Sequence, residues 1–201
     1  MHYISIVVYC TFLYGLFQLK FKNKNHIVLL LILLTCSLTE LLASASDNIS
    51  VLYSFSFTLH NSLWLYLLGS IANHQPKMNI TILLYILCSG INFLFFEKYK
   101  VNFLTFLIGA IFFLIALCSV CIKNLKTENL TFFSNNEFLI VIAPVLFFIG
   151  FSFMFAFRNS DVRFIKLFGK FDLYQCISTF VNVIYYSFIN IYIFKERKIN
   201  A

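Results

Sequence analysis

The sequence predicts an all-α fold, a polytopic bundle of transmembrane helices. Of its 201 residues, 61% are hydrophobic and only 11% are charged, whereas a soluble domain is nearer 45–50% apolar and about 25% charged. The apolar residues form continuous runs of roughly 20, the length that an α-helix needs to cross the hydrocarbon core. A transmembrane β-barrel would instead show segments of about ten residues with alternating polarity.

Seven apolar runs follow one another, and no polar segment between them is long enough for a separate soluble domain. We therefore expect a single transmembrane domain over residues 1–201. The predicted spans are residues 3–19, 26–45, 51–72, 78–96, 101–122, 137–157 and 171–194.

Each span is bounded by a polar or charged segment. The first ends at a basic loop, the second at the polar turn 47–50, and the third at a segment that contains Pro76. The fourth ends at a short charged segment, the fifth at the polar loop 123–136, and the sixth at the charged loop 158–170. The seventh ends at the basic tail 195–198.

The distribution of lysine and arginine predicts an outside N-terminus and a cytoplasmic C-terminus. In that orientation nine basic residues lie inside and six outside, in the direction of the positive-inside rule. The first loop carries Lys20, Lys22 and Lys24 with no acid, and early helices usually set the orientation. The loop 158–170 is the main exception, because we place its basic residues outside.

The sequence holds no recognisable catalytic or metal-binding motif. It lacks His-Glu-x-x-His and any Gly-rich phosphate loop. Cys118 and Cys121 have the C-x-x-C spacing, but they lie in an apolar run without a second pair or a histidine partner. We therefore expect neither an enzyme nor a bound cofactor or metal. The net charge of +7 comes from loops between spans, so we expect no nucleic-acid partner.

Two ionisable residues lie inside predicted spans and mark the candidate site. Glu40 lies roughly 10 Å below the outer surface, and His60 lies roughly 13 Å below it in the next span. An ionisable residue at this depth is costly and is a candidate functional residue. Asn182 falls at a similar depth in the last span, and Asn61 and Trp64 are near His60 in sequence.

The functional interpretation is a ligand-binding polar pocket that opens outward between the second, third and seventh spans. Its expected lining is Glu40, His60, Asn61, Trp64 and Asn182. The alternative is an interhelical hydrogen bond between Glu40 and His60 that only fixes packing. Trp64 on its own is more typical of packing or lipid contact.

Four short segments resemble a known group of proteins. They are 39–42 (Thr-Glu-Leu-Leu), 52–57 (Leu-Tyr-Ser-Phe-Ser-Phe), 135–139 (Asn-Asn-Glu-Phe-Leu) and 181–186 (Val-Asn-Val-Ile-Tyr-Tyr). They are similar to small seven-helix integral membrane proteins of Bacteroidetes, which are often encoded near sensor histidine kinases. Members of that group often carry Ile-Glu where this chain has His60, and Phe-Trp where it has Phe138-Leu139.

We expect a bacterial inner-membrane protein that acts as a sensor or interaction subunit. It would bind a ligand in the outer half of the bundle and signal through its inner loops. The lipid bilayer is the first expected partner, and the resemblance implies a membrane or cytoplasmic protein such as a histidine kinase. An oligomer is compatible with the sequence. The alternatives are a small transporter or channel, and an intramembrane lipid hydrolase that uses Glu40 and His60 as acid–base groups.

Overall fold

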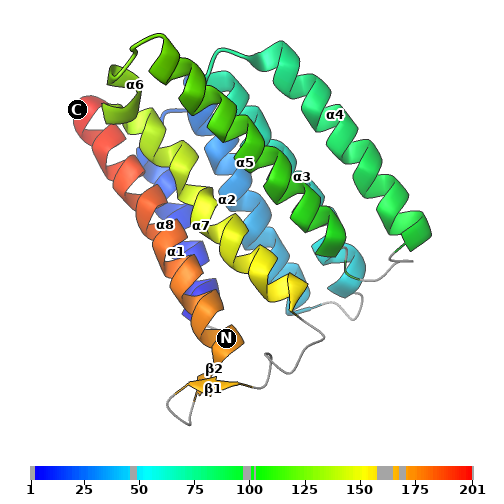
Figure 1. The fold of residues 1–201 in the computed structure, drawn as a ribbon. Coiled ribbons are helices and arrows are strands. Elements are labelled where there is room, and N and C mark those ends of the chain that lie inside the picture. Colours follow the sequence, from blue (N-terminus) through cyan, green and yellow to red (C-terminus); the bar gives the residue numbers. More distant parts are fainter. Residues whose placement is uncertain are drawn as a thin grey trace.

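The computed structural model describes residues 3–45, 49–96, 101, 103–157, 165–167 and 171–200. In this part of the chain, long helices lie side by side and run alternately up and down (Figure 1). The long helices are α1 (Tyr3–Gln18), α2 (Lys24–Ala43), α3 (Ile49–Ile71), α4 (Gln75–Ile91), α5 (Phe103–Lys126), α7 (Asn136–Ala156) and α8 (Leu173–Asn200). The short elements are a π-helical turn (Asn92–Phe96) after α4, the helix α6 (Thr131–Ser134), and the paired strands β1 (Lys166–Leu167) and β2 (Phe171–Asp172).

Five of the described helices are long and apolar enough to cross a membrane. They are α2, α4 with its π-helical turn, α5, α7 and α8. The structure thus confirms a helical protein of the multi-pass membrane type. The prediction of seven spans is met only in part, because α1 and α3 fall outside this group.

Neither of the two remaining helices is both long enough and apolar enough to cross a membrane, each for a different reason. Helix α1 has 16 residues, about 24 Å at the helical rise, and is apolar but short. Helix α3 has 23 residues, about 34 Å by the same rise, and is long enough. Its composition is more polar, because it carries serines, His60 and Asn61 along its middle.

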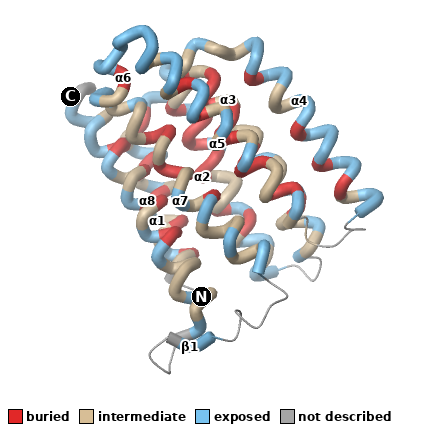
Figure 2. Tube along the Cα trace, in the orientation of Figure 1, coloured by how far each residue is buried: buried red, intermediate tan, exposed pale blue. Residues whose placement is uncertain are grey.

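Helix α3 lies at the centre of the bundle, which explains how it accommodates those polar residues. It packs against α2, α4, α5 and α7, so its side chains face other helices on several sides. Buried residues gather in the middle of the bundle, whereas the peripheral α4 is exposed along most of its length (Figure 2). In a membrane, the apolar exposed surface of α4 would face lipid.

Several helix boundaries differ from the predicted spans. Helix α8 continues to Asn200 and thus includes the predicted tail. Helix α5 continues to Lys126, and α6 occupies part of the predicted loop 123–136. The charged ends of these helices extend beyond the apolar run, because lysine and arginine favour helix and interact well with a helix C-terminus. Residues 46–48, 97–100, 158–164 and 168–170 of the predicted connections lie outside the described residues.

Nine basic residues gather at one end of the bundle, which we call the basic end. This end comprises the α1–α2 loop, the α3–α4 turn, the segment between α5 and α7, and the last turns of α8 (Figure 1). The nine residues are Lys20, Lys22, Lys24, Lys77, Lys123, Lys126, Lys195, Arg197 and Lys198.

Candidate functional site

Three polar side chains meet in the interior of the bundle, and two of them belong to the predicted site. The Trp64 indole N–H donates to His60 Nε2 at 3.2 Å and to the Tyr185 hydroxyl at 3.1 Å. The same hydroxyl lies 3.2 Å from His60 Nε2. Since an indole N–H can only donate, Nε2 must accept, and His60 is then a neutral imidazole that carries its proton on Nδ1. We call these three residues the central triangle.

The central triangle joins α3 to α8 within a dense aromatic core. Trp64 and Tyr185 are fully buried, and His60 is 6% exposed. The ring centroids of Tyr185 and Phe147 of α7 are 4.7 Å apart. The ring centroids of Trp64 and Phe113 of α5 are 6.4 Å apart. The polar atoms of the triangle are thus directed at one another inside an apolar shell.

Asn61 lies beside the triangle. Its side chain connects α3 to α4 instead of lining the predicted pocket. Its amide Nδ2 donates to the Tyr85 hydroxyl at 3.1 Å, and that hydroxyl donates to the Phe57 carbonyl at 3.4 Å. Asn61 is fully buried, and its Oδ1 finds no hydrogen-bond partner among the described residues. The amide packs on Gly109 of α5, where an added Cβ would come within 2.5 Å of Nδ2. A small residue therefore permits close helix approach here.

Glu40 is half-buried on α2 and pairs with α1. Its Oε2 accepts a hydrogen bond from Ser5 Oγ at 2.6 Å. The neighbouring Thr39 reaches α3 instead, through a 2.6 Å hydrogen bond between its hydroxyl and that of Ser56. Both Glu40 and His60 are described, and no hydrogen bond or ion pair joins them. The structure therefore gives the two predicted partners different neighbours.

Asn182 is buried on α8, and its side chain bonds within its own helix. Its Nδ2 donates to the Ser178 carbonyl at 2.8 Å. Of the five predicted site residues, His60 and Trp64 are thus brought together directly, while Asn61, Glu40 and Asn182 each have another partner.

A second polar cluster, at the basic end, was not predicted. His26 of α2 is 1% exposed. Its Nδ1 accepts from the Lys20 backbone N–H at 3.2 Å, so its Nε2 carries the proton and lies 3.2 Å from Glu196 Oε2 of α8. The other carboxylate oxygen, Glu196 Oε1, accepts from Asn136 Nδ2 of α7 at 2.7 Å. Three helices are therefore connected through one carboxylate. A sequence signal existed, because Glu196 is a lone acid in a basic tail.

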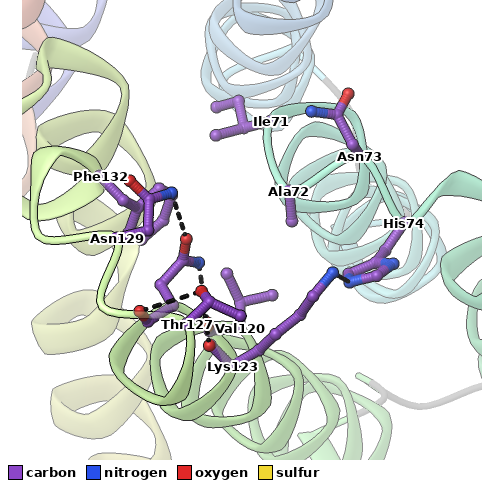
Figure 3. A pocket seen from close by; sticks show the side chains of 10 residues that line it. Ile71, Ala72, Asn73, His74, Val120, Lys123, Thr127, Asn129 and Phe132 are labelled. Atoms are coloured by element: carbon purple, nitrogen blue, oxygen red, sulfur yellow. Dashed lines mark hydrogen bonds between the residues drawn. The ribbon is translucent and has the colours of Figure 1, made fainter.

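Two cavities lie at the basic end, between the α3–α4 turn and the end of α5. Figure 3 shows the larger of them. The larger has a volume of about 310 Å³, and the smaller, beside it, about 220 Å³. Both are lined by His74 and Lys123, whose Nε2 and Nζ atoms are 2.7 Å apart. None of the five predicted site residues lines either cavity.

Among the described residues, no group of three or more His, Cys, Asp or Glu side chains is placed to hold a metal ion. The cysteines in this part of the chain are all free thiols. Comparison of the chain with family models, with curated proteins and with solved structures gave no match.

Proposed function

We propose that this chain is a sensor or interaction subunit of a bacterial inner membrane, without an enzymatic activity of its own. One observation carries the proposal. Helix α8 runs unbroken for 28 residues and bears Asn182, Tyr185 of the central triangle, and Glu196 at the basic end. A rigid helix with polar contacts at successive depths can transmit a shift or rotation from one side of a membrane to the other.

The proposal includes seven membrane crossings, with the basic end in the cytoplasm. Helix α3 is long enough to cross, and its polar side chains are covered by neighbouring helices, as membrane helices require. Helix α1 packs against α2 and α8, and a short apolar helix can be accommodated by local thinning of the bilayer. Nine basic residues at one end agree with the positive-inside rule.

The contacts favour this class over the two alternatives. A transporter or channel needs a polar path, whereas the middle of the bundle is filled by buried aromatic rings, among them Trp64, Phe113 and Tyr185. A hydrolase needs an acid and a base that share one reacting atom. His60 instead directs Nε2 at Trp64 and Tyr185, and Glu40 accepts from Ser5.

The lipid bilayer and a protein that binds the basic end are the proposed partners. Resemblance to the Bacteroidetes group favours a histidine kinase as that protein. Ligand entry is proposed from the end opposite the basic end, where the half-buried Glu40 offers a carboxylate. His60, Asn61, Trp64 and Asn182 would then respond to the ligand through α3 and α8 rather than contact it together.

The test is photo-crosslinking in the native host, with the full-length chain. A photoreactive residue replaces exposed Lys22 or Lys195 at the basic end, or exposed Ala45 at the other end as the matched control. We expect one protein to cross-link from both basic-end positions and not from Ala45. When the photoreactive residue at Lys22 or Lys195 is combined with Glu40→Gln, the yield of cross-linked protein should change at least twofold. The same combination with Gly90→Ala should not change this yield.

Three outcomes would contradict the proposed function. The first is an equal pattern of cross-linked proteins from Ala45, Lys22 and Lys195, which would indicate contact without a specific partner. The second is protein-dependent flux of ions or small solutes in liposomes, which would favour the transporter. Lipid composition that changes with the amount of protein would favour the hydrolase instead.

A further inference from the structure

The two cavities at the basic end share three lining residues, His74, Val120 and Lys123. We treat them together as one cleft with a polar half and an apolar half. The polar half is the 310 Å³ cavity, which Asn73, Lys123, Asn124, Thr127 and Asn129 line together with His74. Its lining is completed by Ile71, Ala72, Val120 and Phe132. The 220 Å³ cavity adds Lys77, Ser119 and the apolar side chains of Met78 and Ala116, and it shares Val120 with the larger one. A ligand that fits both halves must itself be amphipathic.

The polar wall is held in place by bonds among its own residues. Asn129 Nδ2 donates to Asn124 Oδ1 at 2.9 Å, and Thr127 Oγ1 donates to the Lys123 carbonyl at 3.1 Å (Figure 3). The two helices whose C-terminal ends border the cleft, α3 and α5, are each followed by a residue in the left-handed region, Asn73 at φ 55° and Glu128 at φ 53°. These helix-ending turns expose the cleft between α3 and α5.

The charge of the cleft favours an anion. Lys123 reaches across it from α5 to His74, so its ammonium lies over the cavity (Figure 3). An ammonium has three N–H donors, and the bond to His74 uses one. The C-terminal ends of α3 and α5 contribute partial negative charges of about half a unit each, and the N-terminal end of α4 offsets one of them. The full charges of Lys77 and Lys123 outweigh these partial charges and the one carboxylate near the cleft in sequence, Glu128, which lines neither cavity.

We propose that this cleft binds an anionic phospholipid, with the phosphate group at Lys123 and His74 and an acyl chain along Met78, Ala116 and Val120. A phosphate ester is the anion that suits a basic pocket between helices at the cytoplasmic membrane surface. The apolar half of the cleft points to a lipid as the source of that phosphate rather than a soluble ester. The site lies apart from the central triangle and does not depend on the proposed signalling role, but it rests on the proposed cytoplasmic orientation of the basic end.

The test uses delipidated full-length protein and native mass spectrometry, with phosphatidylglycerol and phosphatidylcholine as probes. We expect phosphatidylglycerol to bind at least fivefold more tightly than phosphatidylcholine. Lys123→Gln should weaken phosphatidylglycerol binding about fivefold, the effect of one lysine at an anionic surface. Lys126→Gln is the matched control, since Lys126 is on the same turn of α5 and lines neither cavity. It should change the affinity less than twofold.

Two further variants separate the headgroup from the acyl chain. Lys123→Arg keeps the charge and should retain most of the affinity. Ser119→Trp fills the apolar cavity from an exposed position and should abolish tight lipid binding. Helix content verifies that each variant is folded, and Trp64 fluorescence does so for the lysine variants, in which Trp64 stays the one tryptophan.

Three results would overturn the proposal. Equal losses in Lys123→Gln and Lys126→Gln would show diffuse attraction rather than a site. Equal affinity for the two lipids would remove the anion selectivity. Displacement of phosphatidylglycerol by millimolar glycerol phosphate or inorganic phosphate, with no effect of Ser119→Trp, would show that the cleft takes a soluble phosphate compound.

Discussion

Gly109→Ala should destabilise the protein strongly, because the α5 backbone lies directly on the amide of Asn61. A Cβ at this position would lie 2.5 Å from Asn61 Nδ2 and 2.7 Å from Asn61 Cγ, and 2.9 Å from Tyr85 Cζ. Both neighbours are fully buried, so neither can move aside cheaply. Overpacking of this kind costs about 1–3 kcal/mol.

A second cost follows if Asn61 rotates away from the new methyl group. The hydrogen bond from Asn61 to Tyr85 would then be lost, and interhelical hydrogen bonds in membranes contribute about 0.6–2 kcal/mol. The expected decrease in the free energy of unfolding is therefore about 2–4 kcal/mol. The matched control is Gly90→Ala on α4, where an added Cβ meets nothing within 4 Å. Both variants gain the same helix propensity from alanine, so their difference isolates the steric effect.

The assay is unfolding of the purified protein by SDS, monitored through helix content and the fluorescence of Trp64, the one tryptophan in the chain. Trp64 of α3 is fully buried and donates a hydrogen bond to Tyr185 of α8, so its emission reports on the packed core. Surface substitutions usually change the free energy of unfolding by no more than about 0.5 kcal/mol. If the free energies of unfolding of the two variants differ by less than that, the close approach of α5 to α3 is refuted.

Two further substitutions test the polar contacts between helices. Tyr185→Phe removes the hydroxyl that meets both His60 and Trp64 and should lower the free energy of unfolding by about 0.6–2 kcal/mol; unfolding identical to that of the unaltered protein would contradict the central triangle. Glu196→Gln replaces two acceptor oxygens by one acceptor and one donor, so either His26 or Asn136 faces an N–H. The expected cost in the same SDS assay is about 1–3 kcal/mol, and no change would argue against the carboxylate as a three-helix junction.

The sequence predicted the helices well because membrane crossing depends on length and composition. Continuous apolar runs placed α2 and α5 within a few residues of their observed starts, and the same signal located α7. The same signal located α3 within two residues, 51–72 against Ile49–Ile71. Its interior position lets α3 carry polar groups that lower its hydropathy, so α3 is not among the five helices apolar enough to cross a membrane. The end of α8 was missed because the helix continues past the apolar run through charged residues.

The candidate site was harder to predict, because helices that are apolar all round do not show which face meets which neighbour. Depth placed Glu40 and His60 at similar levels, but the rotation of each helix directs Glu40 to Ser5 and His60 to Tyr185. Tyr185 was overlooked because a tyrosine among many aromatic residues carries no distinct signal. The cleft at the basic end arises from two helix ends that are distant in sequence, and no local pattern reveals it.

Whether α3 crosses the membrane, and in which direction, can be measured directly at two positions that flank it. In a full-length chain whose six cysteines are replaced by serine, a single cysteine is introduced as Ala45→Cys or Lys77→Cys. Both positions are exposed. A membrane-impermeant maleimide should label Ala45→Cys in intact cells and Lys77→Cys only after permeabilisation. Labelling of both from the same side would show that α3 does not cross, and the reverse pattern would place the basic end outside the cytoplasm.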